Sequence, residues 1–260
     1  MRIALIQIES GEDKEANFKK AKEYLAKAAE QKSDIVCLSE NFLYRGSNMS
    51  KVAENLASRY ISSFQELARF HNLNIILGSI ALSTGTGERV TNSSLIIDRT
   101  GKIIHRYDKI YMYDVENADV SYRESDTTKP GDRPGIFELD GIKMGVGICV
   151  DLRYPEYFRE LVKSGVKIIF LPSNFRKVTG KLAWEILTRS RAIENQAYFC
   201  ACGQTGGLGA LERCGNSRII SFDGSIISQL GEEEDVVIAD IDFESLNKFR
   251  KEFPVLKQMK

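Results

Sequence analysis

Strand-like apolar runs follow one another in two different ways along this chain, and this feature limits the possible fold most. Some neighbouring runs are joined by turns short enough for an antiparallel hairpin, at Arg99-Thr100-Gly101 and at Asp140-Gly141, a pair that suits the positive φ angles of a type I′ turn. Other runs are separated by stretches with helical spacing of apolar residues. Both connections in one chain predict an α/β fold with a mixed sheet, or two packed sheets, and helices outside them. The expected strands cover residues 1–10, 35–38, 74–80, 94–98, 102–107, 136–139 and 142–149.

Helices are expected in the intervening segments. The first follows an acidic stretch at residues 12–15, and the others lie near residues 49–70, 155–164 and 180–195. The apolar residues of the first helix at core spacing are Phe18, Ala21, Leu25 and Ala28. Those of the last helix are Leu182, Ile186 and Ile193, followed by Ala197. We expect both sets to be buried.

The charge balance excludes several classes of partner. Lys and Arg total 36, Asp and Glu total 36, and the formal net charge is zero. This balance gives no electrostatic footprint for nucleic acid or an anionic membrane. No window approaches the roughly 20 apolar residues of a membrane helix, and the first residues make a poor signal peptide. No linker divides the chain and its five cysteines are few, so we expect one domain over residues 1–260 in the reducing cytoplasm.

The residues that could hold a metal or a cofactor are sparse. The chain has two histidines, His71 and His105, and the pair Cys200-x-Cys202 lacks the spacing of a zinc site. No Walker A pattern occurs, and the glycines of residues 203–209 precede no amphipathic helix, which makes a dinucleotide site a weak interpretation. The sequence predicts neither a metal nor a cofactor.

Cys149 is the strongest candidate for chemistry. It follows an apolar strand-like run, and Pro155 shortly after it suits the first turn of a helix. A thiol at such a turn is expected to be exposed, to meet the positive end of a helix and to have a lowered pKa. The alternative, a buried core cysteine, is a common fate of free thiols.

A cysteine nucleophile needs a base, and a carboxylate can serve where burial raises its pKa. Glu40 directly follows the run 35–38, and Lys109 follows the run 102–107 among tyrosines. A buried ammonium could stabilise both a thiolate and a developing oxyanion. Taken singly, Glu40 could be a surface carboxylate and Lys109 a solvated lysine.

Three ordered motifs resemble the Glu–Lys–Cys motifs of the nitrilase superfamily of carbon–nitrogen hydrolases: Leu-Ser-Glu40-Asn-Phe, Tyr-Asp-Lys109-Ile-Tyr and Gly-Ile-Cys149-Val-Asp-Leu-Arg-Tyr-Pro-Glu. The similarity runs over nearly the whole chain. It implies a four-layer α-β-β-α sandwich, and dimers or larger homo-oligomers in which outer helices stack. It also implies that Glu40 is the general base, Lys109 the cation that stabilises the oxyanion and Cys149 the nucleophile. Glu124 matches a second glutamate that positions the substrate or the lysine, with an ordinary loop carboxylate as the alternative.

The segment around Cys149 looks most like the ω-amidase branch, which hydrolyses the terminal amide of α-ketoglutaramate and α-ketosuccinamate. Arg153 matches an arginine that holds the far carboxylate of the substrate there, and Thr179 matches a threonine that assists it. A guanidinium is a natural bidentate clamp for a carboxylate. The alternatives are an ion pair of Arg153 with Asp151 or Glu156, and a helix N-cap for Thr179.

The resemblance predicts hydrolysis of a small-molecule carboxamide through a thioester on Cys149. Lys109 and the backbone N–H of Val150 would hold the oxyanion. An N-carbamoyl hydrolase or a broad aliphatic amidase would share this machinery, and a catalytically silent binding protein could share the fold. Three features depart from the branch pattern and leave the shape of the acyl pocket open: the pair Arg176-Lys177, Asn174 in place of a small residue, and the glycine-rich loop 206–214.

Overall fold

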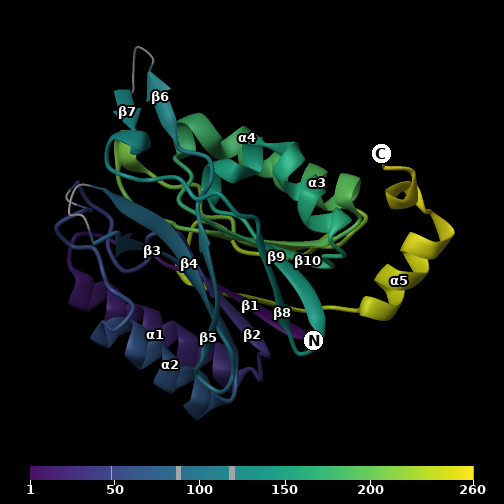
Figure 1. The fold of residues 1–260 in the computed structure, drawn as a ribbon, viewed down its shortest axis with the longest axis horizontal. Coiled ribbons are helices and arrows are strands. Elements are labelled where there is room, and N and C mark those ends of the chain that lie inside the picture. The colour runs from purple at the N-terminus through teal and green to yellow at the C-terminus, as the bar shows by residue number, and fades with distance from the viewer. Residues whose placement is uncertain (48, 86–88, 117–120, 260) are drawn as a thin grey trace.

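Two six-stranded sheets form the centre of the protein, which was examined as a computed structural model (Figure 1). The structure describes residues 1–47, 49–85, 89–116 and 121–259, and the side chains of Thr179 and Ala210 lie outside the described part. In order across the first sheet, the strands are β14 (Asp235–Asp240), β1 (Arg2–Gln7), β2 (Ile35–Leu38), β3 (Asn74–Ser83), β4 (Val90–Ile97) and β5 (Ile103–Asp108). Those of the second are β13 (Ile226–Gln229), β12 (Arg218–Ile220), β11 (Tyr198–Gly203), β10 (Ile168–Ser173), β9 (Ile142–Val146) and β8 (Gly135–Leu139).

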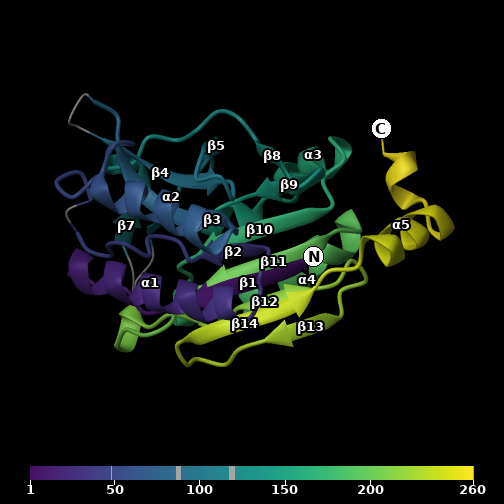
Figure 2. The ribbon, with the colours of Figure 1, turned by 90° about the horizontal axis from the view of Figure 1, so that it is seen from below.

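Helices cover the outer face of each sheet. Figures 1 and 2 show α1 and α2 along the first sheet, and α3 and α4 along the second. The helices are α1 (Lys14–Glu30), α2 (Arg59–His71), α3 (Pro155–Lys163), α4 (Lys177–Asn195) and α5 (Phe243–Glu252). A small hairpin of β6 (Asp114–Glu116) and β7 (Ser121–Arg123) projects from this body, and α5 leads to the C-terminus. This is the expected four-layer α-β-β-α sandwich.

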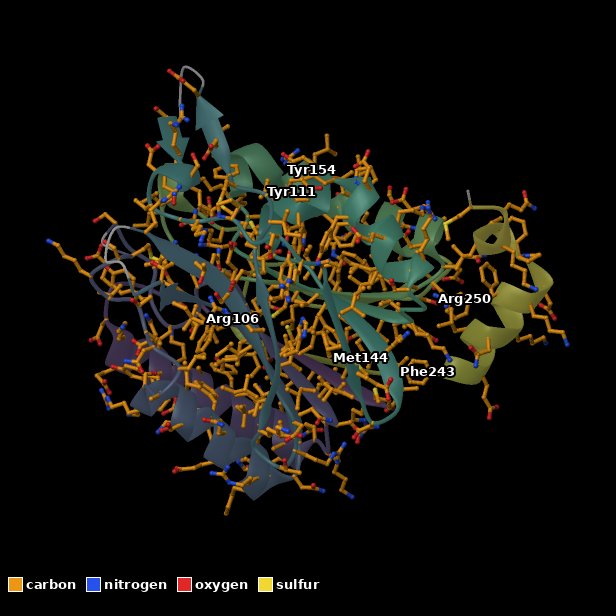
Figure 3. The ribbon with its side chains drawn as sticks, viewed as in Figure 1. Arg106, Tyr111, Met144, Tyr154, Phe243 and Arg250 are labelled. Atoms are coloured by element: carbon orange, nitrogen blue, oxygen red, sulfur yellow. The ribbon has the colours of Figure 1, made fainter. Side chains whose placement is uncertain are left out.

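The alternation of side chains along β1 shows why the layers stack in this order. Ala4 and Ile6 belong to the apolar cluster that includes Phe18 of α1, whereas Ile3 and Leu5 belong to the cluster that includes the second sheet. Successive residues of a strand point to opposite faces, so a strand that is apolar throughout must be covered on both sides. Met144 of β9, labelled in Figure 3, is fully buried in the second of these clusters.

The expected elements are present, with shifted ends. Both turns occur, and Asp140 and Gly141 have φ angles of 50° and 75°, as a type I′ turn requires. The helix expected over residues 49–70 begins only at Arg59, because Ser58 caps it by accepting a hydrogen bond from the Ile61 N–H. Strand β4 begins at Val90 instead of residue 94. Its first part was missed because residues 91–94 are polar, yet they are buried in the structure.

The prediction of buried residues along α4 was wrong for Leu182, Ile186 and Ile193 and right for Ala197, which follows the helix and is fully buried. Leu182, Ile186 and Ile193 are 70%, 52% and 51% exposed. The face that packs on the second sheet includes polar residues that donate hydrogen bonds to nearby backbone carbonyls. Its buried members are Trp184, Thr188, Arg191, Ala192 and Asn195. Within the described residues, no helix is long and apolar enough to cross a membrane.

Gly78 lies where two strands of the first sheet come unusually close. It has a φ angle of +23°, and a Cβ atom there would lie 2.2 Å from the Ser39 carbonyl oxygen and 2.6 Å from that of Leu38. The register of β3 against β4 shifts at this point, between Leu77 and Ile80. Only glycine permits this approach, which brings the end of β2 against β3 immediately before Glu40.

We predict that Gly78→Ala lowers the free energy of unfolding by about 1–3 kcal/mol, because the added methyl group must displace backbone atoms. Denaturant unfolding followed by circular dichroism measures this change. Gly11→Ala is the control, because a Cβ at Gly11 would meet nothing within 4 Å. Equal stability of the two variants would show that the end of β2 can move freely.

Candidate active site

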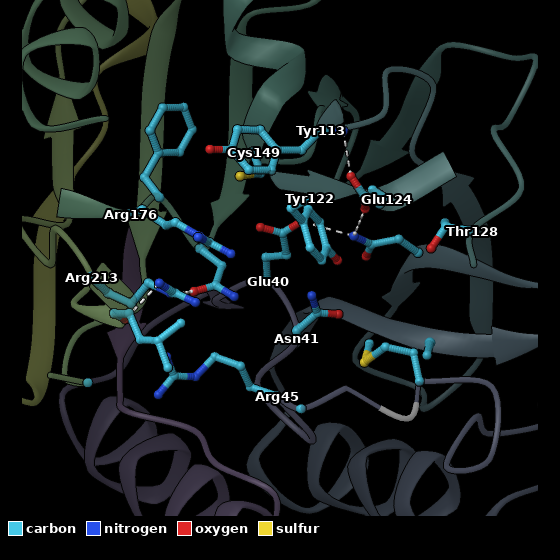
Figure 4. A pocket seen from close by; sticks show the side chains of 18 of the residues that line it. Glu40, Asn41, Arg45, Tyr113, Tyr122, Glu124, Thr128, Cys149, Arg176 and Arg213 are labelled. Atoms are coloured by element: carbon cyan, nitrogen blue, oxygen red, sulfur yellow. Dashed lines mark hydrogen bonds between the residues drawn. The ribbon is translucent and has the colours of Figure 1, made fainter. Parts of the chain in front are cut away.

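Glu40, Lys109 and Cys149 each follow the end of a strand and line one cavity of about 750 Å³. Glu40 pairs with Ser79 as an isolated bridge just beyond β2, and Lys109 directly follows β5. Cys149 follows β9 in the opposite sheet. Figure 4 shows Cys149 and Glu40 pointing into this space, beside Glu124. The sequence therefore predicted which strand ends meet.

Lys109 lies between two carboxylates in the interior and is 2% exposed. Its Nζ donates to Glu40 Oε1 at 3.0 Å and to Oε2 and Oε1 of Glu124 at 2.8 and 3.0 Å. Burial alone would lower the pKa of this ammonium. Glu124 and Glu40 outweigh burial and raise the pKa of Lys109 well above its usual value. The lysine therefore stays a cation although it is buried.

Glu124, expected in the long segment 108–135, is held by further bonds. It begins the short 3-10 helix η1 (Glu124–Asp126), and its Oε2 accepts the Tyr113 N–H at 2.8 Å. Asn92 Nδ2 donates to Glu40 Oε1 at 2.9 Å and to Glu124 Oε1 at 3.3 Å. Asn92 joins both carboxylates and was missed from the sequence, where its polar run seemed to precede the strand.

Cys149 sits at a sharp turn with a left-handed backbone, φ 50°, at the start of the short helix η2 (Cys149–Arg153). Asp151, fully buried, holds this turn: its Oδ2 accepts the Ile148 N–H and the Tyr107 hydroxyl, both at 2.7 Å. Burial raises the pKa of Asp151 to about 6. Arg191 of α4 donates to the Leu152 carbonyl from Nε and Nη2, at 3.1 and 2.8 Å.

Two contacts hold the segment that follows Lys109 against the turn that carries Cys149. The rings of Tyr111 and Tyr154 stack with centroids 3.6 Å apart, and Figure 3 shows them side by side. Tyr111 lies two residues after Lys109, and Tyr154 directly follows η2. The Tyr111 N–H also donates to Asp151 Oδ1 at 3.1 Å. The segments that carry the cation and the thiol are thus fixed against each other.

The exposed, acidified thiol expected from the sequence is not what the structure contains. Cys149 is 8% exposed. Burial and the negative charge of Glu40 raise the pKa of its thiol well above the usual value, and the opposing effects of Lys109 and the Asn174 backbone are weaker. Burial is the largest of these effects, because Cys149 belongs to the apolar cluster between the sheets. Cys149 therefore rests as a neutral thiol and needs a base.

The other candidate residues lie around this core. Val150 is buried and lines the cavity, as does Arg153, whose guanidinium carbon is 5.9 Å from the centroid of the Phe175 ring. Asp151, which with Glu156 was a suggested ion-pair partner of Arg153, accepts the two hydrogen bonds of the turn described above. The backbone of Thr179 lies in the first turn of α4, and its side chain falls outside the described residues. Arg176, not Thr179, occupies the N-cap position.

Metal-ligating groups do not cluster in the part of the chain that the structure describes: no three His, Cys, Asp or Glu side chains there could share an ion.

Comparison with known proteins defines the class. The fold is that of the nitrilase superfamily, because a crystal structure of Nit3 from Saccharomyces cerevisiae, a member of that superfamily, matches with a TM-score of 0.88. It is 28% identical and covers 98% of this chain and 94% of that one. The family model for carbon–nitrogen hydrolases matches residues 2–251, and the chain belongs to this family.

Two relatives with assigned activities are similar over almost their whole length. An omega-amidase of Saccharomyces cerevisiae is 30% identical, over 99% of this chain and 92% of its own. A deaminated glutathione amidase of Yersinia enterocolitica is 34% identical, over 98% of this chain and 91% of its own.

We predict that Glu40→Gln lowers the pKa of the Cys149 thiol and yet reduces kcat on an amide substrate by about 10²–10⁴-fold, the usual contribution of a general base. The pKa falls because a negative charge that raised it is gone while Lys109 remains. The rate of thiol alkylation against pH, corrected with Cys149→Ala, measures the pKa.

Glu138→Gln, a change at an exposed position of β8, is the control and should alter neither value. A thiol pKa that rises in Glu40→Gln would contradict the assignment of Glu40 as the neighbouring base.

Proposed function

We propose that this protein, as one domain over residues 1–260, hydrolyses a carboxamide through a covalent thioester on Cys149. The observation that carries the proposal is the position of Lys109, held between Glu40 and Glu124 in the cavity that contains the cysteine. A buried cation beside a neutral thiol and a carboxylate is suited to acyl transfer, since the carboxylate can take the proton of the thiol and the cation can stabilise the oxyanion that appears only during reaction.

The first half of the reaction forms the thioester. Glu40 takes the proton of the thiol as Cys149 Sγ attacks the amide carbonyl carbon. The oxyanion that forms is stabilised by Lys109 Nζ and the backbone N–H of Val150. Glu40 then gives its proton to the leaving nitrogen, the C–N bond breaks, and ammonia or an amine departs. Glu124 remains a carboxylate throughout and holds Lys109 in place.

The second half releases the acid. A water molecule takes the place of the departed amine, and Glu40 accepts one of its protons as the oxygen attacks the thioester carbon. Lys109 and Val150 stabilise the second tetrahedral oxyanion in the same way. When this intermediate collapses, the C–S bond breaks, Glu40 returns its proton to sulfur, and the carboxylic acid leaves.

We propose a dicarboxylate monoamide of the α-ketoglutaramate type as the substrate. Arg153 lines the cavity and would bind the far carboxylate, with Thr179 assisting. The similarity to an omega-amidase supports this choice. A second candidate is the activity named for the Yersinia relative, deaminated glutathione amidase, which is supported by the higher identity of 34%.

A substrate panel tests this function. We predict that the protein releases ammonia from α-ketoglutaramate and succinamate faster than from an aliphatic amide, a carbamoyl amine or a nitrile. Cys149→Ala should abolish release, and Arg153→Ala should lower kcat/KM for the carboxylate-bearing amides by about 10–100-fold, the effect of losing a charged hydrogen bond. Arg153→Ala with an unchanged order of preference would remove Arg153 from the substrate site and leave the Cys149 assignment standing.

We also propose that the protein is a cytoplasmic homodimer or larger homo-oligomer. Leu182, Ile186 and Ile193 form an exposed apolar face on outer helix α4, and such a face is typical of a protein interface. All five cysteines are free and buried, which fits a reducing compartment. Fractionation of the source cells tests the location.

Sedimentation velocity tests the assembly. We predict that the wild-type protein sediments as a dimer or larger species and that Ile186→Glu shifts it to the monomer, because a charge cannot be buried unpaired at an apolar contact. Glu185→Gln, next to it on α4, is the control. A monomeric wild type would reject the proposed interface.

A further inference from the structure

Three features that depart from the family pattern come together at one wall of the cavity. Asn174, Arg176 and Arg213, the last in the loop 206–214, all line it. Arg213 Nε donates to Asn174 Oδ1, and Arg213 Nη1 donates to the Leu211 carbonyl at 2.7 Å. The backbones of Arg176 and Arg213 pair as an isolated antiparallel bridge. The departures therefore form a single unit, which we call the arginine wall: Asn174, Arg176 and Arg213.

The arginine wall faces the space beside Glu40. Figure 4 shows the side chains of Arg176 and Arg213 extending toward this space, with Arg45 on a neighbouring side. Arg176 also lies over the ring of Tyr122, with its guanidinium carbon 5.6 Å from the centroid. The two guanidinium groups are thus held in position by an amide, a carbonyl and an aromatic ring.

Four carboxylates line the cavity, those of Glu9, Glu12, Glu40 and Glu124, and in the described residues none of them forms an ion pair with Arg176 or Arg213, although the negative charge of Glu40 acts on Arg213. Glu40 and Glu124 bind Lys109, and Glu9 lies 3.6 Å from Arg45 and accepts the Gly207 N–H at 2.8 Å. Neither Arg176 nor Arg213 forms an ion pair with any carboxylate among residues 1–47, 49–85, 89–116 and 121–259. Arg213 is only 7% exposed, and burial together with the charges of Arg45 and Arg176 lowers its pKa to about 10. A buried cation without an ion-pair partner is costly, so Arg213, with the half-buried Arg176 beside it, suits an anion.

The cavity is also larger than a small monoamide needs. Its volume of about 750 Å³ lies in the upper part of the range that holds drug-sized ligands, roughly 300–1,000 Å³. A monoamide with one far carboxylate, as proposed above, would engage Cys149 and Arg153 and leave the arginine wall without a partner.

We propose that Arg176 and Arg213 form a second anion subsite, so that the preferred substrate is an amide with two anionic groups, one at Arg153 and one at the arginine wall. This rests on the proposed amidase function. A carboxylate suits the subsite because guanidinium groups bind it in a bidentate manner. The second carboxylate can belong to the leaving amine or to the acyl half, and the substrates below distinguish these.

Binding tests the subsite without turnover. The probes are the N-carboxymethyl amide of α-ketoglutarate and its N-isobutyl amide, which has nearly the same shape without the charge. Titration calorimetry on Cys149→Ala should give at least tenfold tighter binding of the charged amide. This preference should fall below about threefold when Arg176→Gln or Arg213→Gln is added. Lys181→Gln, an exposed charge change on α4 outside the cavity, should preserve it.

Turnover then separates the two proposals. Wild-type protein should hydrolyse the N-carboxymethyl amide, or the terminal monoamide of propane-1,2,3-tricarboxylate, with at least tenfold higher kcat/KM than the matched neutral amide. Faster hydrolysis of the N-carboxymethyl amide would place the second carboxylate on the amine half of the substrate. Faster hydrolysis of the tricarboxylate monoamide would place it on the acyl half. Equal binding of charged and neutral amides in all variants overturns the subsite, even if α-ketoglutaramate is hydrolysed. Charge-selective binding without hydrolysis of any amide overturns the amidase function instead.

Because Arg176 is half-buried and makes fewer bonds than Arg213, Arg176→Gln keeps the test valid if Arg213→Gln does not fold.

Discussion

The buried ammonium of Lys109 determines how the residues around it must be placed. A charge in the interior must be paired and hydrogen-bonded, and here two carboxylates from different segments converge on it. That requirement fixes Glu40 at the end of β2, draws the segment with Glu124 inward and makes Asn92 the bridge between them. It also contributes to the state of the thiol, because burial, and after it the negative charge of Glu40, disfavours a thiolate. The proposed base, cation and nucleophile are therefore linked by one arrangement of charges in a buried site.

Much of this could be predicted from the sequence because the signals were local. The type I′ pair Asp140-Gly141, the periodicity of α1 and the run that forms β2 depend on residues close together in the chain. Glu40, Lys109 and Cys149 could be placed at strand ends for the same reason. Their joint occurrence in motifs of a known family indicated that the strand ends meet.

The remaining features depend on contacts between distant segments. Asn92 reads as part of a polar loop until the carboxylates of Glu40 and Glu124 are placed beside it. The polar face of α4 is buried because Arg191 reaches the Leu152 carbonyl and Trp184 reaches that of Asn216, partners that spacing along one helix does not reveal. Burial of Cys149 depends in the same way on the opposite sheet, and for this reason the expected direction of its pKa shift was wrong.

The proposed nucleophile and its proposed base belong to different sheets: Glu40 and Lys109 follow strands of the first, and Cys149 follows a strand of the second. The gap between sulfur and carboxylate is thus set by the thickness of the apolar layer between the sheets, a cluster that includes Ile3 and Leu5 of the first sheet and Met144 and Ile168 of the second. A displacement of about 1 Å between reacting groups can cost roughly a hundredfold in rate. Each methylene group in that layer consequently helps to set the distance over which the proton passes from Cys149 to Glu40 in the proposed reaction. Selection for catalytic speed therefore reaches side chains that never meet a substrate.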